Sequence, residues 1–276
     1  MTLPPRPAWS GLVARFDGDR FAALLDLDGT LAPIAPRPAD AAVPEETRRI
    51  VAALSSLPDS LVVAVSGRGA DDAARLLGVP NAWVIGNHGF ETKPPGAPSQ
   101  PLRGAEEFRD AVEEAAREAS EVARKHAGVI VENKRWTLSV HYRLAREADV
   151  PAVVAAIHAI AAERGLRAMP GKRIVEVRPP LDVDKGVASV ALLRERGFID
   201  DVSMICAGDD RTDEDMFAAV RRAVPQAVTI RILGEDDASP DGYRGSAEFG
   251  APNPNTLRDL LCEILKYRRG RPSRGG

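Results

Sequence analysis

Short apolar runs alternate with helix-like stretches in the first third of the chain, and this alternation constrains the fold more than any other feature. The apolar runs span residues 21–27, 61–65 and 83–85, and the helix-like stretches span 45–57 and 69–77. Continuous apolar runs of this kind are typical of strands buried on both faces of a parallel sheet. The alternation returns in the last third, with helices expected over 184–196, 213–223 and 256–267 and strands over 202–206 and 228–233. We therefore predict that both ends of the chain form one doubly wound α/β domain.

The middle of the chain has a different order of elements. A proline-rich segment at 93–101 is followed by a helical pattern at 105–126, a hairpin pattern at 129–143, a second helical pattern at 150–164, and a second hairpin from 166–169 and 173–177. This αββαββ order is typical of a small α+β domain inserted into a larger one, and the proline pairs 94–95 and 179–180 mark the two crossings. We predict a core domain from residues 1–92 and 181–276 and an inserted cap domain from residues 93–180.

Composition argues against several classes of protein. The chain has 276 residues, a formal net charge of −3 and scattered arginines, which speaks against nucleic acid as a partner. The apolar runs are too short to span a membrane, and the first residues lack the pattern of a secretory signal. The two cysteines, Cys206 and Cys262, give neither a disulfide framework nor a metal-binding pair. We therefore expect a soluble cytoplasmic protein.

The strongest chemical signal is the string DLDGT at residues 26–30, which follows an apolar run. Ligands bind at the carboxyl ends of strands in open α/β sheets, so Asp26 and Asp28 are expected to converge on one crevice. Because a carboxylate is ionised at neutral pH, Asp26 could attack phosphorus without a base to activate it. Asp28 could protonate the leaving oxygen of a sugar and later take a proton from water. Asp-Gly is also a common turn, so a loop without chemistry stays open at this point.

Two weaker signals follow. Ser66-Gly67-Arg68, after the second predicted strand, could hold a phosphate oxygen, although Ser-Gly is also an ordinary turn. Lys185 stands at the start of a predicted helix, where its charge could offset a nucleophile and a phosphate. Lysine is also a common surface residue, so neither signal decides alone.

Several carboxylate residues lie close together in the sequence at residues 209–215, and they complete the set of chemical signals. The acidic residues from Asp213 onward suit the cap and first turn of a helix. Asp209 and Asp210 are harder to explain by structure, because like charges at the end of a strand repel one another unless a cation neutralises them. Ligands that are all oxygen favour Mg2+ over zinc, so we predict a magnesium site.

Taken in order, residues 26–30, Ser66, Lys185 and residues 208–210 resemble the four motifs of the haloacid dehalogenase (HAD) superfamily of phosphotransferases. The resemblance implies a HAD-like Rossmannoid core with an inserted cap, and a catalytic role for three residues. Asp26 would be the nucleophile, Asp28 the general acid and base, and Lys185 the fixed cation. The residues implied in substrate binding are Thr30, Ser66, Gly67 and Arg68. The implied Mg2+ ligands are Asp26, Asp28 through its backbone carbonyl, Asp209 and, as an outer partner, Asp213.

Four further segments of the sequence indicate which phosphate ester is the substrate. Residues 86–91, 131–134, 141–143 and 172–179 look like those of the trehalose-6-phosphate phosphatases, and the resemblance extends over residues 21–265. It implies hydrolysis of trehalose 6-phosphate to trehalose and inorganic phosphate, in trehalose biosynthesis. The residues that it implies in sugar binding are Asn87, His88, Glu91, Lys134 and Glu176. Many relatives carry a fused glucosyltransferase, so any trehalose-6-phosphate synthase partner would be a separate chain, and nothing in the sequence shows contact with one.

Other interpretations stay open. Lys134 could be an exposed turn residue, Glu176 could pair with Arg178 or Arg143, and His88 could be a structural histidine. The substrate could be another glycosyl phosphate, such as sucrose phosphate or glycosyl-3-phosphoglycerate, and a phosphomutase is a further alternative. A catalytically silent regulator that binds sugar phosphate is the alternative from another class, and the presence of the motif aspartates speaks against it.

Overall fold

The structure is a computed structural model that describes residues 9–35, 37, 40–171, 173–234 and 245–271. These residues separate into two compact units. The core unit lies within Met1–Ser99 and Val183–Gly276, and the inserted unit is Gln100–Asp182. The domain limits predicted at residues 93 and 180 stay a prediction. In the described part of the chain no helix is both long and apolar enough to cross a membrane.

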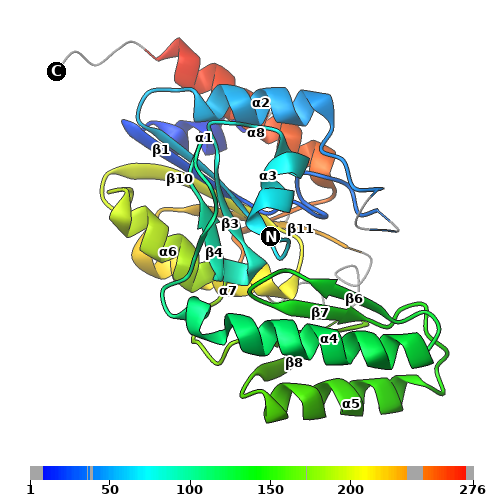
Figure 1. Ribbon diagram of the computed structural model, residues 1–276. Helices are drawn as coiled ribbons and strands as arrows, with labels where there is room; N and C mark the ends of the chain where they lie inside the picture. The colour runs from blue at the N-terminus through cyan, green and yellow to red at the C-terminus, as the bar shows by residue number, and fades with distance from the viewer. Residues whose placement is uncertain (1–8, 36, 38–39, 172, 235–244, 272–276) are drawn as a thin grey trace. The chain divides into compact units, whose positions relative to one another are not determined.

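The core unit is built on a mostly parallel sheet, in which its strands lie in the order β12-β11-β10-β1-β2-β3-β4 (Figure 1). Neighbouring strands pair in parallel except β4, which pairs antiparallel with β3. The strands are β1 (Arg20–Leu25), β2 (Ser60–Val65), β3 (Trp83–Gly86), β4 (Glu91–Lys93), β10 (Val202–Gly208), β11 (Val228–Ile232) and β12 (Phe249–Ala251). The predicted α/β class with a doubly wound parallel sheet is therefore confirmed.

Helices cover both faces of this sheet, as the continuous apolar strands require. One apolar cluster joins strand residues such as Phe21, Ala23 and Leu25 to four helices. These helices are α1 (Trp9–Val13), α2 (Glu45–Ser55), α3 (Ala70–Leu77) and α8 (Pro254–Gly270). On the opposite face α6 (Lys185–Glu195) packs beside α7 (Arg211–Ala223) (Figure 1). Short 3-10 turns, η2 (Ala14–Phe16) and η4 (Asn87–Gly89), complete the unit.

Three segments leave the sheet at the same edge because β1 lies between β10 and β2. Asp26 directly follows β1, and its N–H group donates to the carbonyl of Ala207 in β10 at 2.9 Å. Ser66 directly follows β2, and its N–H group donates to the carbonyl of Ile85 in β3 at 2.8 Å. Asp209 directly follows β10. Parallel pairing therefore brings the three predicted motifs to one edge of the sheet.

The inserted unit has two helices on one face of an antiparallel sheet with the order β6-β7-β9-β8. Leu138 of the sheet packs with Val112 and Val153 of the helices, whereas Ser139 and Glu176, paired across β7 and β9, alternate to the other face. From α4 onward the observed order is the predicted αββαββ. The elements are β5 (Gln100–Pro101), η5 (Ala105–Phe108), α4 (Arg109–Lys125), β6 (Ile130–Asn133), β7 (Leu138–His141), α5 (Val150–Glu163), β8 (Arg167–Gly171) and β9 (Ile174–Arg178).

Three short elements of the core unit, α1, β4 and β12, are absent from the sequence-based prediction. Each has five residues or fewer, which is too short to show a helical or strand period. α1 nevertheless buries Trp9, Leu12 and Val13 in the same apolar cluster as β1. Tertiary packing, and not local pattern, therefore determines these elements.

Candidate active site

A buried lysine lies between two buried carboxylates at the carboxyl edge of the core sheet. Lys185 Nζ donates hydrogen bonds to Asp26 Oδ1 at 2.8 Å and to Asp213 Oδ1 at 2.9 Å. Asp26 follows β1, Lys185 begins α6 and Asp213 lies in the first turn of α7, so three distant segments meet here. Charged groups shielded from water need partners inside the protein, and these three groups supply them to one another.

The start of α6 is fixed from two sides. Asp184 caps the helix by accepting the N–H group of Val187 at 2.7 Å. Gly186 packs against α7 so closely that a Cβ atom there would lie 2.6 Å from the carbonyl oxygen of Asp215. A larger residue at 186 would separate α6 from α7, so glycine keeps Lys185 within reach of Asp213.

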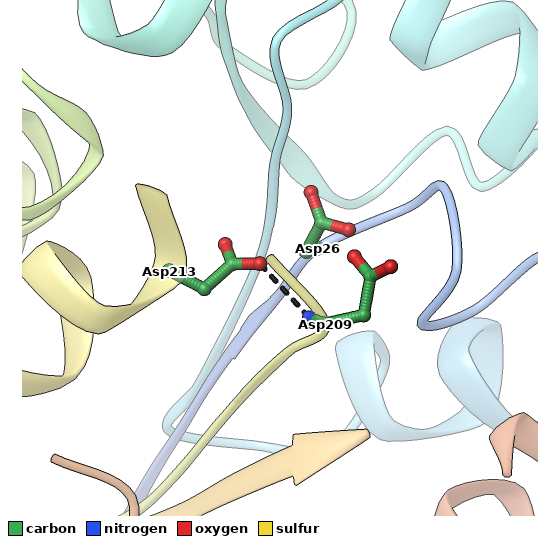
Figure 2. Close-up of side chains that lie close together, drawn as sticks. All are labelled: Asp26, Asp209 and Asp213. Carbon is green, nitrogen blue, oxygen red and sulfur yellow. Dashed lines mark hydrogen bonds between the residues drawn. The ribbon is translucent and has the colours of Figure 1, made fainter. Parts of the chain in front are cut away.

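Three aspartates gather their carboxylates beside this lysine (Figure 2). Asp26, Asp209 and Asp213 each offer one oxygen, and these oxygens lie within 4.8 Å of one another. Asp213 Oδ2 accepts the N–H groups of Asp209 at 2.9 Å and Asp210 at 3.0 Å. Asp210 in turn caps α7 by accepting the N–H group of Asp213 at 3.1 Å. The predicted ligands Asp26, Asp209 and Asp213 are thus brought together.

Gly29 of the DLDGT string lies directly against this cluster. Its φ of +83° is a conformation that favours glycine. A Cβ atom at Gly29 would lie 2.0 Å from Oδ2 of Asp209, so the string requires glycine for space as well as for conformation.

Burial controls the ionisation of these groups. It raises the pKa of Asp26 well above its usual value, against the opposing charge of Lys185. Burial also raises the pKa of Asp209 to about 7 and that of Asp213 to about 6. Burial by itself would lower the pKa of Lys185, yet Asp213 and Asp26 raise it well above its usual value. One ammonium therefore does not neutralise the surrounding carboxylates.

This donor set fits a divalent cation that prefers oxygen. The clustered ligand atoms are all carboxylate oxygens, whereas zinc sites usually contain nitrogen or sulfur. After burial, which is the main cause, neighbouring carboxylates also raise the pKa of Asp209 and of Asp213, and a cation would offset their charge. The side chain of Asp28 is not part of this cluster.

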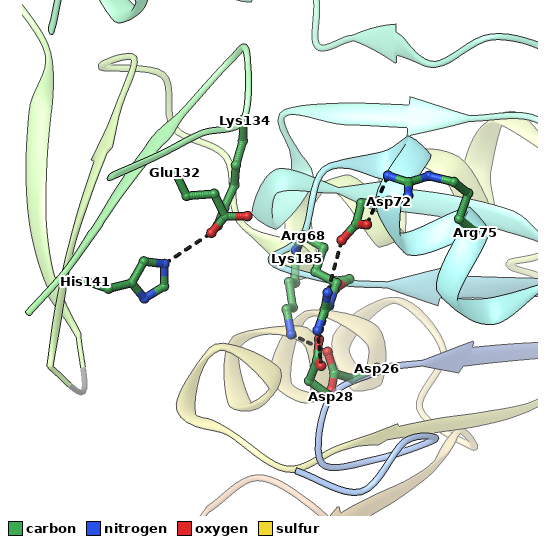
Figure 3. A network of polar contacts seen from close by, with 10 residues as sticks. Asp26, Asp28, Arg68, Asp72, Arg75, Glu132, Lys134, His141 and Lys185 are labelled. Atoms are coloured by element: carbon green, nitrogen blue, oxygen red, sulfur yellow. Dashed lines mark hydrogen bonds and ion pairs between the residues drawn. The ribbon is translucent and has the colours of Figure 1, made fainter. Parts of the chain in front are cut away.

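Asp28 instead forms a two-pronged ion pair with Arg68. Arg68 Nε donates to Asp28 Oδ2 and Arg68 Nη2 donates to Asp28 Oδ1, both at 2.7 Å (Figure 3). Arg68 Nη1 donates to Asp72 Oδ2 at 3.0 Å, and Asp72 also accepts from Arg75 at 3.1 Å. The predicted substrate-binding arginine thus contacts the predicted acid/base, and Asp72 is an additional partner that the sequence did not indicate.

The turn after β2 is held by η4. The N–H group of Arg68 donates to Ser66 Oγ at 3.1 Å, and the carbonyl of Ser66 accepts the N–H group of His88 at 3.1 Å. A Cβ atom at Gly67 would lie 2.5 Å from Nε2 of His88. The structure therefore brings Ser66, Gly67, Arg68 and His88 together, while Thr30 is fully buried in the loop after β1.

Asn87 and Glu91 lie beneath this turn and are buried. Glu91 Oε1 accepts the N–H group of Ala70 at 2.8 Å and a short hydrogen bond from the amide of Asn87. Asn87 N–H donates to the carbonyl of Arg68 at 2.7 Å. Both side chains therefore connect η4 to the start of α3, and in this way they support the turn after β2.

The remaining predicted sugar-binding residues belong to the inserted unit. Lys134 Nζ lies 3.7 Å from Glu176 Oε1 and 4.0 Å from Glu132 Oε2. Glu132 also contacts His141 Nε2 at 3.1 Å (Figure 3), and Glu176 accepts a hydrogen bond from Ser139 at 2.8 Å. These side chains form one polar cluster on the sheet of the inserted unit.

The fold is that of the HAD superfamily, because a solved structure of this kind matches over most of the chain. A trehalose-6-phosphate phosphatase related protein superimposes with a TM-score of 0.75 at 25% identity, covering 90% of this chain and 99% of that one. Residues 24–244 match the sequence profile described as trehalose-phosphatase. The chain therefore belongs to the trehalose-phosphatase family.

Curated relatives agree with this family but are longer. The trehalose-phosphate phosphatase of Mycobacterium avium is 39% identical over 225 residues, which are 80% of this chain and 56% of that protein. An uncharacterized glycosyl hydrolase of Mycobacterium tuberculosis is 35% identical over 260 residues, which are 93% of this chain and 19% of that protein. The chain thus spans about half of one relative and about a fifth of the other.

Proposed function

We propose that the chain hydrolyses trehalose 6-phosphate through an aspartyl-phosphate formed on Asp26. The observation that carries this proposal is the buried contact between Lys185 and Asp26, in a chain that belongs to the trehalose-phosphatase family. It lies at the carboxyl edge of a parallel sheet, where ligands bind in folds of this type. A fixed ammonium beside a carboxylate favours the ionised form, which is the nucleophile.

In the first half-reaction, an oxygen of Asp26 forms a bond to phosphorus while the bond from phosphorus to the sugar oxygen breaks. Asp28 donates a proton to that oxygen, and trehalose leaves. Because Arg68 pairs with both oxygens of Asp28, this pairing must loosen when Asp28 takes up its proton. Arg68 could then turn to the phosphate, with Ser66 beside it.

In the second half-reaction, water attacks phosphorus and the bond from phosphorus to Asp26 breaks. Asp28 accepts the proton of the water, and inorganic phosphate leaves. The pairing of Asp28 with Arg68 must loosen in this step, because both oxygens of Asp28 accept from the guanidinium. Lys185 offsets the charge of Asp26 throughout.

We infer that Mg2+ would be held by Asp26, Asp209 and the backbone carbonyl of Asp28, with Asp213 as an outer partner. When bound, the cation supplies positive charge that offsets the phosphate and the carboxylates. The carboxylate cluster and its raised pKa values support this assignment.

For the sugar, we propose that the inserted unit contributes Lys134 and Glu176, whose charged groups can donate to and accept from vicinal hydroxyls. His88 would contact the substrate beside the turn after β2. We assign Asn87 and Glu91 to the support of that turn, because both are buried and bonded to backbone groups. A trehalose-6-phosphate synthase would supply the substrate.

The test is phosphate release from a panel of sugar phosphates, with and without Mg2+. Asp26→Asn should abolish release, whereas Asp59→Asn makes the same change at an exposed position just before β2, away from the site, and should not. The expected result is that phosphate is released from trehalose 6-phosphate and from no other ester of the panel, and that a chelator abolishes this release. Release from another glycosyl phosphate would contradict the proposed substrate, and no release from any ester would favour the regulator that binds without turnover.

A further inference from the structure

Arg231 is a charged residue on a strand that is otherwise apolar apart from Thr229, and neither the motifs nor the proposed mechanism uses it. It lies near the carboxyl end of β11, in register with Gly208 of β10. Its strand neighbours Ile230 and Ile232 belong to the apolar cluster on one face of the sheet. Alternation therefore directs Arg231 to the opposite face, where α7 begins.

The side chain of Arg231 reaches the loop that carries Asp209. Arg231 Nη1 donates a short hydrogen bond to the backbone carbonyl of Asp210, and it lies 3.7 Å from Glu214 Oε1. The side chain is only 13% exposed, although Asp210 itself is exposed and the hydrogen bond lies at the surface. Hydrogen bonds from a charged donor are stronger than those between neutral groups.

The loop between β10 and α7 is otherwise held from within. Asp213 accepts the N–H groups of both Asp209 and Asp210, which fixes the two peptide groups on either side of Asp209. The next peptide group, which contains the carbonyl of Asp210, is bound from the neighbouring strand by Arg231. Asp213 therefore fixes both peptide groups that flank Asp209, and Arg231 fixes the peptide group that follows them.

We propose that Arg231 is a positioning residue for the divalent cation site, holding the Asp209–Asp210 loop so that Asp209 faces Asp26. The inference rests on the cation site of the proposed function. Residues that orient metal ligands without contacting the metal typically change metal affinity by about 10-fold to 100-fold when they are replaced. We expect about a tenfold loss for Arg231→Met.

The direction in which cation affinity changes when Arg231 is replaced distinguishes this proposal from a purely electrostatic role. If Arg231 acted only as a positive charge near the cluster, its removal would reduce repulsion and tighten cation binding. If it positions Asp209, its removal weakens cation binding although a repulsive charge is lost. The two explanations therefore predict opposite changes.

The experiment measures Mn2+ binding to the full chain without substrate, from the electron paramagnetic resonance signal of free Mn2+, with Mg2+ as competitor. Arg231→Met should raise the dissociation constant about tenfold. Arg231→Lys, which keeps a charged donor one bond short of Nη1, should stay within about threefold of the native chain. Arg231→Gln, whose amide ends two bonds short of Nη1, should weaken binding as Arg231→Met does. Arg222→Met, which removes the same charge from the exposed side of α7, is the matched control and should change little.

Thermal unfolding shows whether each variant is folded. Tighter or unchanged Mn2+ binding by a folded Arg231→Met chain would overturn the inference alone. If that variant does not fold, the Gln variant decides, because a pure charge effect predicts tighter binding for it. A native chain that binds no Mn2+ would overturn the proposed cation site and this inference together.

Discussion

Replacing Lys185 by Met tests the electrostatic balance of the site most directly. The substitution keeps a similar apolar length but leaves Asp26 and Asp213 buried without the ammonium that both contact. The folded protein must then either hold two unpaired charges or protonate them. Either outcome lowers the free energy of unfolding at a pH where carboxyl groups are normally ionised.

The expected loss follows from the burial of the pair. Removing one partner of a buried ion pair costs about 3–5 kcal/mol, and the two contacts of Lys185 share one ammonium, so their contributions do not add. In domains of about 150–250 residues each kcal/mol lowers the midpoint of thermal unfolding by about 2–4 °C. We therefore expect Lys185→Met to lower the midpoint of the core unit by about 6–20 °C at pH 8.

Calorimetry of the metal-free protein measures this shift. Lys266→Met is the matched control, because Lys266 also contacts a carboxylate, Glu263 at 2.9 Å, but its side chain is 63% exposed. Exposed pairs contribute about 1 kcal/mol or less, so the control should shift the midpoint by only a few degrees. Equal shifts for Lys185→Met and Lys266→Met at pH 8 would refute the reasoning.

Two further predictions concern the carboxylates. Burial raises the pKa of Asp209 to about 7 and that of Asp213 to about 6, above the values for an unfolded chain, so the metal-free protein loses stability as the pH rises from about 4 through these values. Mg2+ should consequently raise the midpoint of thermal unfolding more at pH 8 than at pH 5. If Mg2+ raised the midpoint equally at the two pH values, the result would contradict the cation site. Gly29→Ala should weaken Mn2+ binding, because its Cβ atom would meet Asp209. Gly96→Ala is the control, because Gly96 has a similar positive φ of +68° and a Cβ atom there would meet nothing within 4 Å. This substitution therefore introduces only the backbone strain, about 1–2 kcal/mol. Equal Mn2+ affinities for the two variants would contradict the contact between residue 29 and Asp209.

The sequence predicts the fold well because its signals are local. Continuous apolar runs indicate buried parallel strands, and parallel strands bring Asp26, Ser66 and Asp209 to one edge without further information. The sequence predicts the helix Lys185–Glu195 over 184–196, and the cap residues Asp184 and Arg196 account for the difference at its two ends. The meeting of Asp26, Asp209 and Asp213 follows from the same topology.

What the sequence does not predict depends on side-chain direction and burial. Nothing in the string SGR shows that Arg68 binds Asp28, because the two lie 40 positions apart and meet only after β1 and β2 pair. The sequence also does not show that Asn87 and Glu91 are buried, that Asn87 binds Glu91, or that Glu91 binds the N–H group of Ala70. For Arg231 the sequence offers one signal, which is a charged residue on a strand that is otherwise nearly apolar.

Under the proposed mechanism, burial of the nucleophile accounts for both the lysine and the cluster of aspartates. Asp26 must be ionised to attack phosphorus, but burial raises its pKa well above the usual value. Lys185 opposes this shift, yet it is shared with Asp213, whose oxygens also hold the loop that carries Asp209. A second positive charge is therefore needed to keep all of these carboxylates ionised at neutral pH, and the cluster of oxygens is where a cation would bind. The burial that would shield an aspartyl-phosphate from water thus also makes the ionisation of its nucleophile depend on a cation.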